Sequence, residues 1–234
     1  MPPVHVFATT VEEARRAGAL PRYLAQLTEE ERSRHARMRP DPRGDEFLVG
    51  RALARKALAE LAPGVAAVFT AGSHGRLEVA EAGISFNLSH ADGLVVCAVA
   101  DSVVGVDVEK VDPSRTEPAI WENYFAPPEV AALAALPEER RCERFFRYWT
   151  LKEAYIKARG LGLSIPLREF WFEVAASAPI RIAFAASLDD DPGRWQFAQQ
   201  ALGPDHLLAV AVATAEPVTL VIHRGLPGQG GRAR

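Results

Sequence analysis

Cysteine is scarce in this sequence, since only two occur among 234 residues. Cys97 lies in an apolar stretch and Cys142 in a charged one, with no histidines at ligand spacing, which argues against a zinc site and a disulfide scaffold. No apolar run approaches the roughly 20 residues that a membrane-spanning helix needs. The N-terminal residues lack the basic and apolar regions of a signal peptide. These absences predict a reduced, cytoplasmic protein without a membrane partner.

The sequence also lacks a strong charge of either sign. Its 27 Lys and Arg residues and 30 Asp and Glu residues give a formal net charge of −3, which provides no general attraction to nucleic acid. A glycine-rich loop ending in Lys and Ser or Thr, which marks a P-loop, is absent too. With 48% hydrophobic and 24% charged residues, the composition is that of a soluble globular protein.

The most informative stretch, residues 103–111, is rich in valine and free of proline, so it predicts a β-strand. Because side chains alternate along a strand, its valines at even positions share one face, while Gly105, Asp107 and Glu109 share the other. Two neighbouring carboxylates resist burial unless a cation compensates them. A hard divalent ion such as Mg²⁺ is a candidate, and acids solvated on an exposed face are the alternative.

Helices and strands surround this stretch. Thr28 and Glu31 have the spacing of a capping box, which predicts a helix from about residue 29. Apolar periodicity predicts longer helices over about 45–61 and 138–159. Strands at 84–89 and 94–100 closely precede the acidic strand, which indicates an antiparallel meander of these segments. Further strands are predicted at 4–8, 170–174, 180–185, 195–199, 207–213 and 218–223.

Each part of the chain thus has a long helix followed by short strands, and residues 94–100 resemble residues 207–213. We expect an α+β fold of two pseudosymmetric subdomains, each a long helix packed on a mostly antiparallel sheet. The first would span residues 1–104 and the second 105–224, with a disordered tail at 225–234. The acidic strand lies at the join, so the active site is expected between the halves.

The predicted helix over 138–159 carries residues that would complete a site. Trp149, Glu153 and Lys157 are spaced four apart and line one helix face. If this face meets Asp107 and Glu109, a third carboxylate and a lysine form a site for Mg²⁺ and a phosphate group. The alternative is a surface Glu–Lys pair without a function.

Several motifs occur in this order at characteristic intervals. They are Phe86-Asn87-Leu88-Ser89-His90, Gly105-Val106-Asp107-Val108-Glu109-Lys110, Trp149-Thr150-Leu151-Lys152-Glu153-Ala154-Tyr155-Ile156-Lys157 and Gly160-Leu161-Gly162-Leu163-Ser164-Ile165-Pro166-Leu167. The set resembles the phosphopantetheinyl transferases, of the larger monomeric, surfactin-synthetase-activating (Sfp-like) type, over about residues 45–174. The resemblance implies two pseudosymmetric α+β halves with coenzyme A between them.

The resemblance also implies an activity, which is transfer of the 4′-phosphopantetheine arm from coenzyme A to a serine of an acyl or peptidyl carrier protein, with release of 3′,5′-ADP. Coenzyme A would be the co-substrate and Mg²⁺, or alternatively Mn²⁺, the metal. We expect a monomer that binds acidic helical carrier domains and neither nucleic acid nor membrane. Fatty-acid, polyketide and nonribosomal-peptide carriers all stay open. The candidates for a basic docking face, which could equally be a solvated helix face, are Arg140, Arg141, Arg144 and Arg147.

By resemblance, Asp107, Glu109 and Glu153 match the family's metal ligands. Lys157 matches the lysine that contacts the pyrophosphate, where a cation would stabilise developing charge. Glu153 is also the expected proton acceptor, directly or through a water, provided that its carboxylate is ionised. His90 joins Glu153 and Lys157 in the expected catalytic set, as a phosphate contact rather than a base.

The expected contacts to coenzyme A include Lys157 and come from several further segments. Ser89 and His90 match residues near the coenzyme A phosphates. Arg51 falls near the family's N-terminal basic contacts to the 3′-phosphate. Arg76 stands where the family usually has Gly-Lys-Pro, and it keeps the positive charge of that lysine as a nucleotide contact.

Two other functions fit the same residues. One is a non-catalytic protein that binds coenzyme A or a carrier protein, although such a binder has no evident need for three metal-binding acids. The other is a different Mg²⁺-dependent phosphoryl-transfer enzyme, such as a nuclease, which the charge balance opposes.

Overall fold

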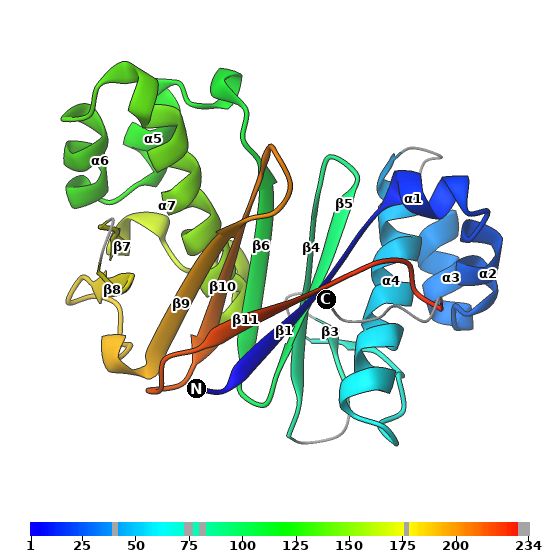
Figure 1. The fold of residues 1–234 in the computed structure, drawn as a ribbon. Helices are drawn as coiled ribbons and strands as arrows, with labels where there is room; N and C mark the ends of the chain where they lie inside the picture. Colours follow the sequence, from blue (N-terminus) through cyan, green and yellow to red (C-terminus); the bar gives the residue numbers. More distant parts are fainter. Residues whose placement is uncertain (39–41, 73–76, 80–82, 176–177, 229–234) are drawn as a thin grey trace.

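The chain folds into two α+β halves that lie side by side, as the computed structural model in Figure 1 shows. The structure describes residues 1–38, 42–72, 77–79, 83–175 and 178–228. Each half packs a long helix on a mostly antiparallel sheet, which confirms the expected fold class. Within these described ranges, no helix combines the length and the apolar character that crossing a membrane requires.

The first half is built on a sheet with the strand order β11-β1-β5-β4. Neighbouring strands run antiparallel except β11, which pairs parallel with β1. Helix α4 packs on this sheet, and three short helices lie beyond it (Figure 1). The bounds are β1 Pro3–Thr10, α1 Val11–Arg16, α2 Leu20–Ala25, α3 Glu29–Ala36, α4 Pro42–Leu61, β2 Thr70–Ala71, β3 Leu77–Glu78, β4 Ser85–Ala91, β5 Leu94–Ala100 and β11 Thr219–Arg224.

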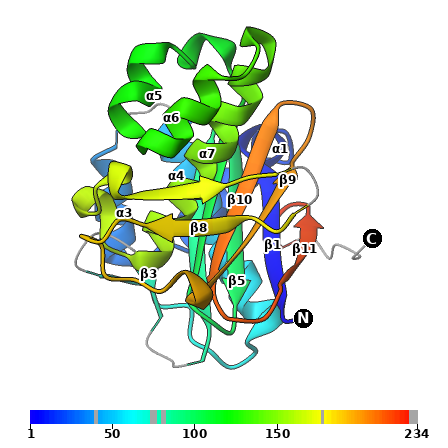
Figure 2. The same ribbon diagram turned by 90° about the vertical axis from the view of Figure 1, so that its left-hand side faces the viewer.

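The second half is built on an antiparallel sheet with the order β6-β10-β9, and helix α7 crosses it (Figure 2). The predicted helix over 138–159 is confirmed as α7. The bounds are β6 Val104–Lys110, η1 Pro113–Arg115, α5 Pro118–Tyr124, α6 Pro127–Ala134, α7 Glu138–Arg159, η2 Gly162–Ser164, η3 Leu167–Glu169, β7 Phe170–Glu173, β8 Arg181–Phe184, η4 Pro192–Arg194, β9 Trp195–Ala201 and β10 His206–Ala213.

The two halves repeat one topology. In the first half, α4 follows β1 in the chain, and the strands pair in the order β1-β5-β4. In the second half, α7 follows β6 in the chain, and the strands pair in the order β6-β10-β9. The similar segments 94–100 and 207–213 are the strands β5 and β10, each with a neighbour on both sides. Because a strand in that position is buried on both faces and both edges, both segments are runs of small apolar residues.

The predicted meander is correct for β4 and β5 and wrong for β6. The β4–β5 hairpin closes through Asp92 and Gly93, both at positive φ, as a two-residue hairpin turn requires. Strand β6 instead leaves that sheet and pairs with β10. The physical reason is that polar side chains of β4, rather than its backbone, face the free edge of β6.

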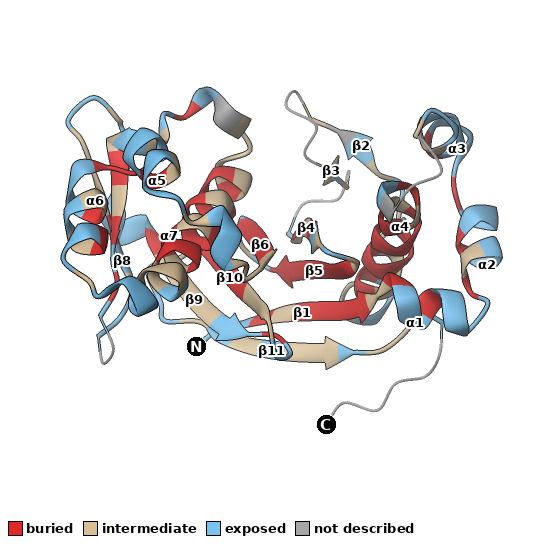
Figure 3. Cartoon of the chain, turned by 90° about the horizontal axis from the view of Figure 1, so that it is seen from above, coloured by how far each residue is buried: buried red, intermediate tan, exposed pale blue. Residues whose placement is uncertain are grey.

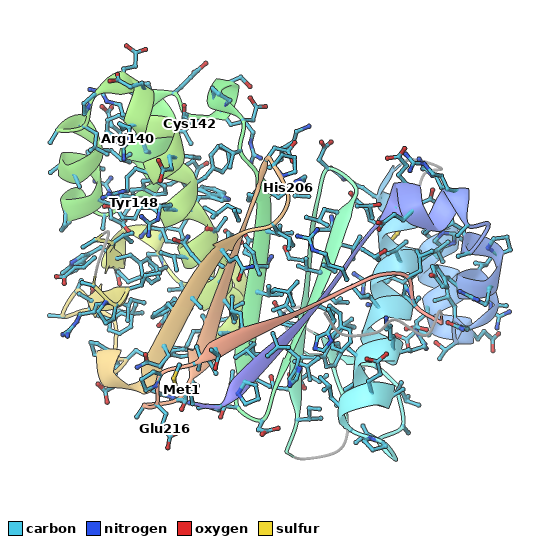
Figure 4. All side chains as sticks on the ribbon, viewed as in Figure 1. Met1, Arg140, Cys142, Tyr148, His206 and Glu216 are labelled. Carbon is cyan, nitrogen blue, oxygen red and sulfur yellow. The ribbon has the colours of Figure 1, made fainter. Side chains whose placement is uncertain are left out.

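Those side chains form a seam between the halves. Alternate residues of β4 accept hydrogen bonds from alternate backbone amides of β6, which satisfies groups that would otherwise lack partners. The bonds are Val104 N to Ser85 Oγ (3.2 Å), Val106 N to Asn87 Oδ1 (3.0 Å) and Val108 N to Ser89 Oγ (3.3 Å). At one end of the seam, the ring of His206 donates through Nε2 to the Ala91 carbonyl at 3.2 Å (His206 is labelled in Figure 4).

An apolar core also joins the halves. The valines of β6 at positions 104, 106 and 108 are buried, as the alternation predicts. They pack in one cluster with alternate residues of β1, β5 and β10. Seen from above in Figure 3, these buried strands lie between the helices of the two halves. The opposite face of β6, with Gly105 and the acids, is thereby directed at α7.

The C-terminal strand returns to the first half. Residues 219–224, which the predicted division at residue 104 assigns to the second half, pair with β1. Beyond them the Pro227 carbonyl accepts hydrogen bonds from Arg22 and Tyr23. Residues 229–234 of the expected tail lie outside the described residues. The division of the chain at residue 104 stays a prediction.

Gly105 is the point where β6 and α7 come closest. A Cβ atom at this position would lie 2.1 Å from the Ala154 carbonyl oxygen and 2.3 Å from the Ala158 amide nitrogen. Both atoms belong to the helix backbone and cannot rotate away. Glycine here is therefore required by the packing of the helix on the strand, not by a special φ angle.

We predict that Gly105→Ala destabilises the protein by about 3 kcal/mol, because the methyl group must push α7 off the sheet. Gly50→Ala is the matched control, since its Cβ would sit in ordinary contact, 3.7 Å from Val95. Urea unfolding followed by circular dichroism measures both. Equal stabilities for the two variants would contradict this role of Gly105.

Candidate active site

A compact polar group lies where β4, β6 and α7 meet. Lys157 donates from Nζ to Asp107 Oδ1 at 2.6 Å and to Ser89 Oγ at 2.8 Å, and Ser89 Oγ also contacts Asp107 Oδ1 at 3.0 Å. The Asp107 side chain is 5% exposed and that of Lys157 is 28% exposed. Ser89, Asp107 and Lys157 come from the first three of the four sequence motifs. The fold therefore brings one residue of each of these three motifs into direct contact.

The remaining oxygen of the aspartate is distinctive. Asp107 Oδ2 is buried and has no hydrogen-bond partner among the described residues. Burial raises the pKa of Asp107, although the neighbouring Lys157 charge opposes that rise. A buried carboxylate with one unused oxygen is costly unless something binds it.

Glu153 shares this environment. Burial raises the pKa of Glu153, and the negative charges of Asp107 and Glu109 raise it further, against the attraction of Lys157. The three predicted carboxylates thus interact electrostatically. Within the described parts of the chain, however, no three His, Cys, Asp or Glu side chains gather closely enough to form a ready-made metal site.

Glu109 is held by two donors, one on each carboxylate oxygen. Trp149 Nε1 donates to Glu109 Oε1 at 3.1 Å, and Arg115 donates from a terminal nitrogen to Oε2 at 2.8 Å. Trp149 was expected on this helix face. The sequence does not single out Arg115, because this residue lies several positions after β6. Only the turn of η1 brings its side chain back to Glu109.

His90 lies at the rim of the site. Its side chain is 53% exposed, and Nδ1 lies 3.0 Å from Oε2 of the buried Glu46 on α4. Glu46 also accepts a hydrogen bond from the Gly93 amide at 3.0 Å, which fixes the β4–β5 turn. The helix thereby positions the histidine. Glu46 was missed in the sequence because a single acid in a helix carries no signal.

Arg51 is buried in the first half rather than extended toward the other site residues. Its Nε lies 2.9 Å from Glu31 Oε1, and its guanidinium stacks 4.5 Å from the centre of the Phe47 ring. Burial lowers the pKa of Arg51 to about 10. Arg55 shares the same Glu31 carboxylate at 2.5 Å. The predicted nucleotide contact Arg76 lies outside the described residues.

The donor chemistry at the site fits a hard divalent ion. Asp107, Glu109 and Glu153 offer carboxylate oxygens, which Mg²⁺ and Mn²⁺ prefer. The unpartnered oxygen of Asp107 is a ready ligand. A bound cation would also offset the repulsion that raises the pKa of Glu153.

A cleft lies at the interface of the halves; its lining includes Ala158, the residue after Lys157, but none of the residues of the polar group. Its volume is about 510 Å³, and both halves line it, with Leu77 and Phe86 on one side and Arg159, Arg194 and Trp195 on the other. The lining mixes apolar side chains with the guanidinium groups of Arg159 and Arg194, a combination that suits an organic anion.

Lys152, inside the third motif, does not face the site. Its ammonium is buried and bonds to Glu129 Oε2 (2.8 Å) and to the carbonyls of Leu167 (2.8 Å) and Phe170 (2.6 Å). Glu129 in turn accepts from the amides of Ala126, which directly precedes α6, and of Phe172 in β7. This saturated ion pair ties α6 and α7 to the following loop, so Lys152 has a structural role.

Comparison with known proteins assigns a family to this arrangement. The 4′-phosphopantetheinyl transferase superfamily matches residues 103–212, which include β6, α7 and β10. A 4′-phosphopantetheinyl transferase of Bacillus subtilis is 30% identical over 170 residues, covering 70% of this chain and 74% of that protein. The 4′-phosphopantetheinyl transferase HetI of Nostoc sp. is 36% identical over 137 residues, covering 58% of this chain and 54% of that protein.

The similarities are limited in coverage and in structural agreement. The matched part spans about half the length of the Nostoc protein and of a similar protein from Aneurinibacillus migulanus, at 54% and 53%. Among solved structures, the holo-[acyl-carrier-protein] synthase of Thermotoga maritima aligns with 49% of this chain and 64% of its own, at a TM-score of 0.39 and 19% identity. That structural likeness is too low to bear on the site.

We predict that Lys152→Met destabilises the fold by about 3–5 kcal/mol, because it leaves Glu129 buried and unpaired. Lys110→Met is the control, since this lysine is 44% exposed and its pair with Asp92 lies at the surface. Thermal and urea unfolding measure the difference. A loss of less than about 1 kcal/mol in Lys152→Met would exclude the structural role.

The raised pKa of Glu153 predicts a pH dependence of stability. Between its ordinary value of 4.5 and the raised value, the folded chain holds more protons at Glu153 than the unfolded chain, so stability falls as the pH rises. Glu153→Gln removes this fall and becomes more stable than the unsubstituted protein at higher pH. Urea unfolding in chelator over a series of pH values tests it. Glu143→Gln, at an exposed glutamate of the same helix, should show the same change of unfolding free energy with pH as the unsubstituted protein. The same pH dependence in Glu153→Gln would refute the prediction.

Proposed function

The chain belongs to the 4′-phosphopantetheinyl transferase superfamily, and we propose that it transfers the 4′-phosphopantetheine arm of coenzyme A to a serine of an acyl or peptidyl carrier protein. The observation that carries the proposal is the contact of Lys157 with Asp107 and Ser89, since it joins three of the four motifs at one point. A chance resemblance of short motifs would not predict that convergence.

In the proposed reaction, the serine oxygen of the carrier attacks the β-phosphorus of coenzyme A. A bond forms between that oxygen and the phosphorus, and the bond from the phosphorus to the bridging oxygen breaks. The electron pair leaves with 3′,5′-ADP. The serine proton passes to the ionised carboxylate of Glu153, whose pKa is raised by burial and by the acids beside it, so that it is a stronger base than an ordinary glutamate.

Lys157 is proposed to stabilise the transition state. Its ammonium lies at the polar group and is partly exposed, so a pyrophosphate that enters can take it as a partner. Negative charge increases on the pyrophosphate oxygens as the bond breaks, and a fixed cation there lowers the barrier. Ser89, which accepts from Lys157, and the exposed His90 at the rim are the proposed neighbouring phosphate contacts.

Asp107, Glu109 and Glu153 are the proposed ligands of Mg²⁺ or Mn²⁺. When bound, the ion would neutralise charge on the pyrophosphate and help to orient it. The chain's own part is to hold these carboxylates together against their repulsion. It does so by packing α7 on β6 at Gly105 and by placing Lys157 and Trp149 among them.

Coenzyme A is proposed to extend from Lys157 to the cleft between the halves, which Ala158, Leu161 and Arg194 help to line. Arg76, which lies outside the described residues, is a proposed nucleotide contact from its place in the sequence. Arg51 would contact the 3′-phosphate only after leaving its pair with Glu31, because its guanidinium is buried there.

The carrier protein is proposed to dock on the second half. Of the candidate arginines, Arg141 donates to the carbonyls of Leu136 and Ala134, and Arg147 donates to Gln199, so both serve the chain's own packing. Arg140 is 67% exposed and lies at the outer end of α7 (Figure 4). The protein is proposed to act as a monomer, since residues of both halves meet in one site. Its proposed location is the cytoplasm.

The test is the intact mass of an apo carrier protein after incubation with this protein, coenzyme A and Mg²⁺. We predict a gain of about 340 Da that disappears in chelator and with Asp107→Asn, and that forms more slowly with Lys157→Ala. Fatty-acid, polyketide and nonribosomal-peptide carriers are each tried. No gain with any of them, from folded protein that still binds coenzyme A, would favour a non-catalytic binding protein.

A further inference from the structure

The carboxylates of the site differ in how their oxygens are used. Asp107 Oδ2 is buried without a hydrogen-bond partner among the described residues. Both oxygens of Glu109 are engaged, Oε1 by Trp149 and Oε2 by Arg115. Of these two predicted metal ligands, Asp107 has an oxygen available to bind an ion, whereas Glu109 is already paired with the guanidinium of Arg115.

The position of Arg115 is built by its own short segment. Asp112 Oδ1 accepts hydrogen bonds from the Ser114 amide (2.9 Å) and the Ser114 hydroxyl (2.8 Å), which caps the single turn η1. The turn reverses the chain just after β6 and directs Arg115 back to Glu109. The guanidinium also lies 5.7 Å from the centre of the Phe146 ring on α7. Glu109 on β6 and Phe146 on α7 thus both contact this side chain, which follows directly after the capped residues of the turn.

A divalent ion and Arg115 compete for the same oxygen. Mg²⁺ approaches a carboxylate oxygen to about 2.1 Å and repels a guanidinium that donates to it. Trp149 cannot yield its place readily, because its ring packs between Phe145 and Tyr124. Arg115 can move away from Glu109, since its side chain is 47% exposed.

We propose that Arg115 is an internal counter-cation of the acidic site, which a divalent metal ion must displace from Glu109 and which thereby lowers the site's affinity for the ion. This inference rests on the proposed function, in which Glu109 is a metal ligand. It makes Arg115 a residue that sets metal affinity, and it couples occupation of the site to the turn of residues 112–116. The turn lies between β6 and α5, on the second half.

The experiment measures metal binding without any carrier protein. Binding of Mg²⁺ is followed by titration calorimetry and binding of Mn²⁺ by the spin-resonance signal of the free ion. Arg115→Gln should bind both ions about three- to tenfold more tightly than the unsubstituted protein, because the competing charge is gone. Arg115→Lys, which keeps the charge but loses the planar fork, should fall between them.

Lys110→Gln is the matched control. It removes the same charge from the residue next to Glu109, but Lys110 pairs with Asp92 on the surface and does not contact Glu109. Its affinity should stay within about twofold of the unsubstituted protein. An equal gain in Lys110→Gln and Arg115→Gln would reduce the effect to general charge and overturn the proposal.

The other outcomes separate this inference from the proposed function. Unchanged or weaker binding in Arg115→Gln, while the unsubstituted protein binds and Asp107→Asn does not, overturns the role of Arg115 and leaves the metal site standing. Binding in neither the unsubstituted protein nor Arg115→Gln overturns both. Binding in Arg115→Gln alone supports the proposal in its strongest form.

Discussion

The site depends on the direct contact between the backbone of α7 and strand β6 at Gly105. Without a side chain at this position, the helix lies against the strand, and its face with Trp149, Glu153 and Lys157 runs along the acidic face of β6. The matching is geometric, since residues four apart on a helix and alternate residues on a strand each form a row. Any side chain at Gly105 would separate those rows.

That contact concentrates negative charge in a partly buried place, and the chain balances it locally. Lys157 and Ser89 satisfy one oxygen of Asp107, and Trp149 with Arg115 holds Glu109. The balance is incomplete, which is why the pKa of Glu153 is raised by burial and by the neighbouring acids. An incompletely balanced acidic site favours a cation from outside.

The buried pair of Lys152 and Glu129 is an instructive contrast on the same helix. There every charged group has several partners, and no buried oxygen of Glu129 is left over. Asp107 keeps a buried oxygen without a partner among the described residues. Saturation marks a pair that holds the fold together, whereas the unused oxygen of Asp107 is where the proposed metal ion would bind.

The seam between the halves leaves room for that ligand. Because β4 meets β6 through side chains and not through a backbone ladder, the sheets stay separate, and a cleft follows the interface beside them. The apolar core behind the seam holds the halves together. The chain that leaves β10 returns to the first half as β11, whose backbone pairing with β1 adds a further connection between the halves.

The sequence by itself determined the local elements and the rows of residues. Periodicity predicts α7, the capping box predicts α3, and alternation predicts which side of β6 is apolar, because each is a property of neighbours along the chain. The motifs predict the family for the same reason. Tertiary structure alone decided that β6 pairs with β10, that Glu31 holds Arg51, and that Arg115 contacts Glu109. These pairings are made through a sheet edge, a buried ion pair and a turn that reverses the chain. Such contacts depend on which surfaces meet in space, and the spacing of residues along the sequence does not specify that.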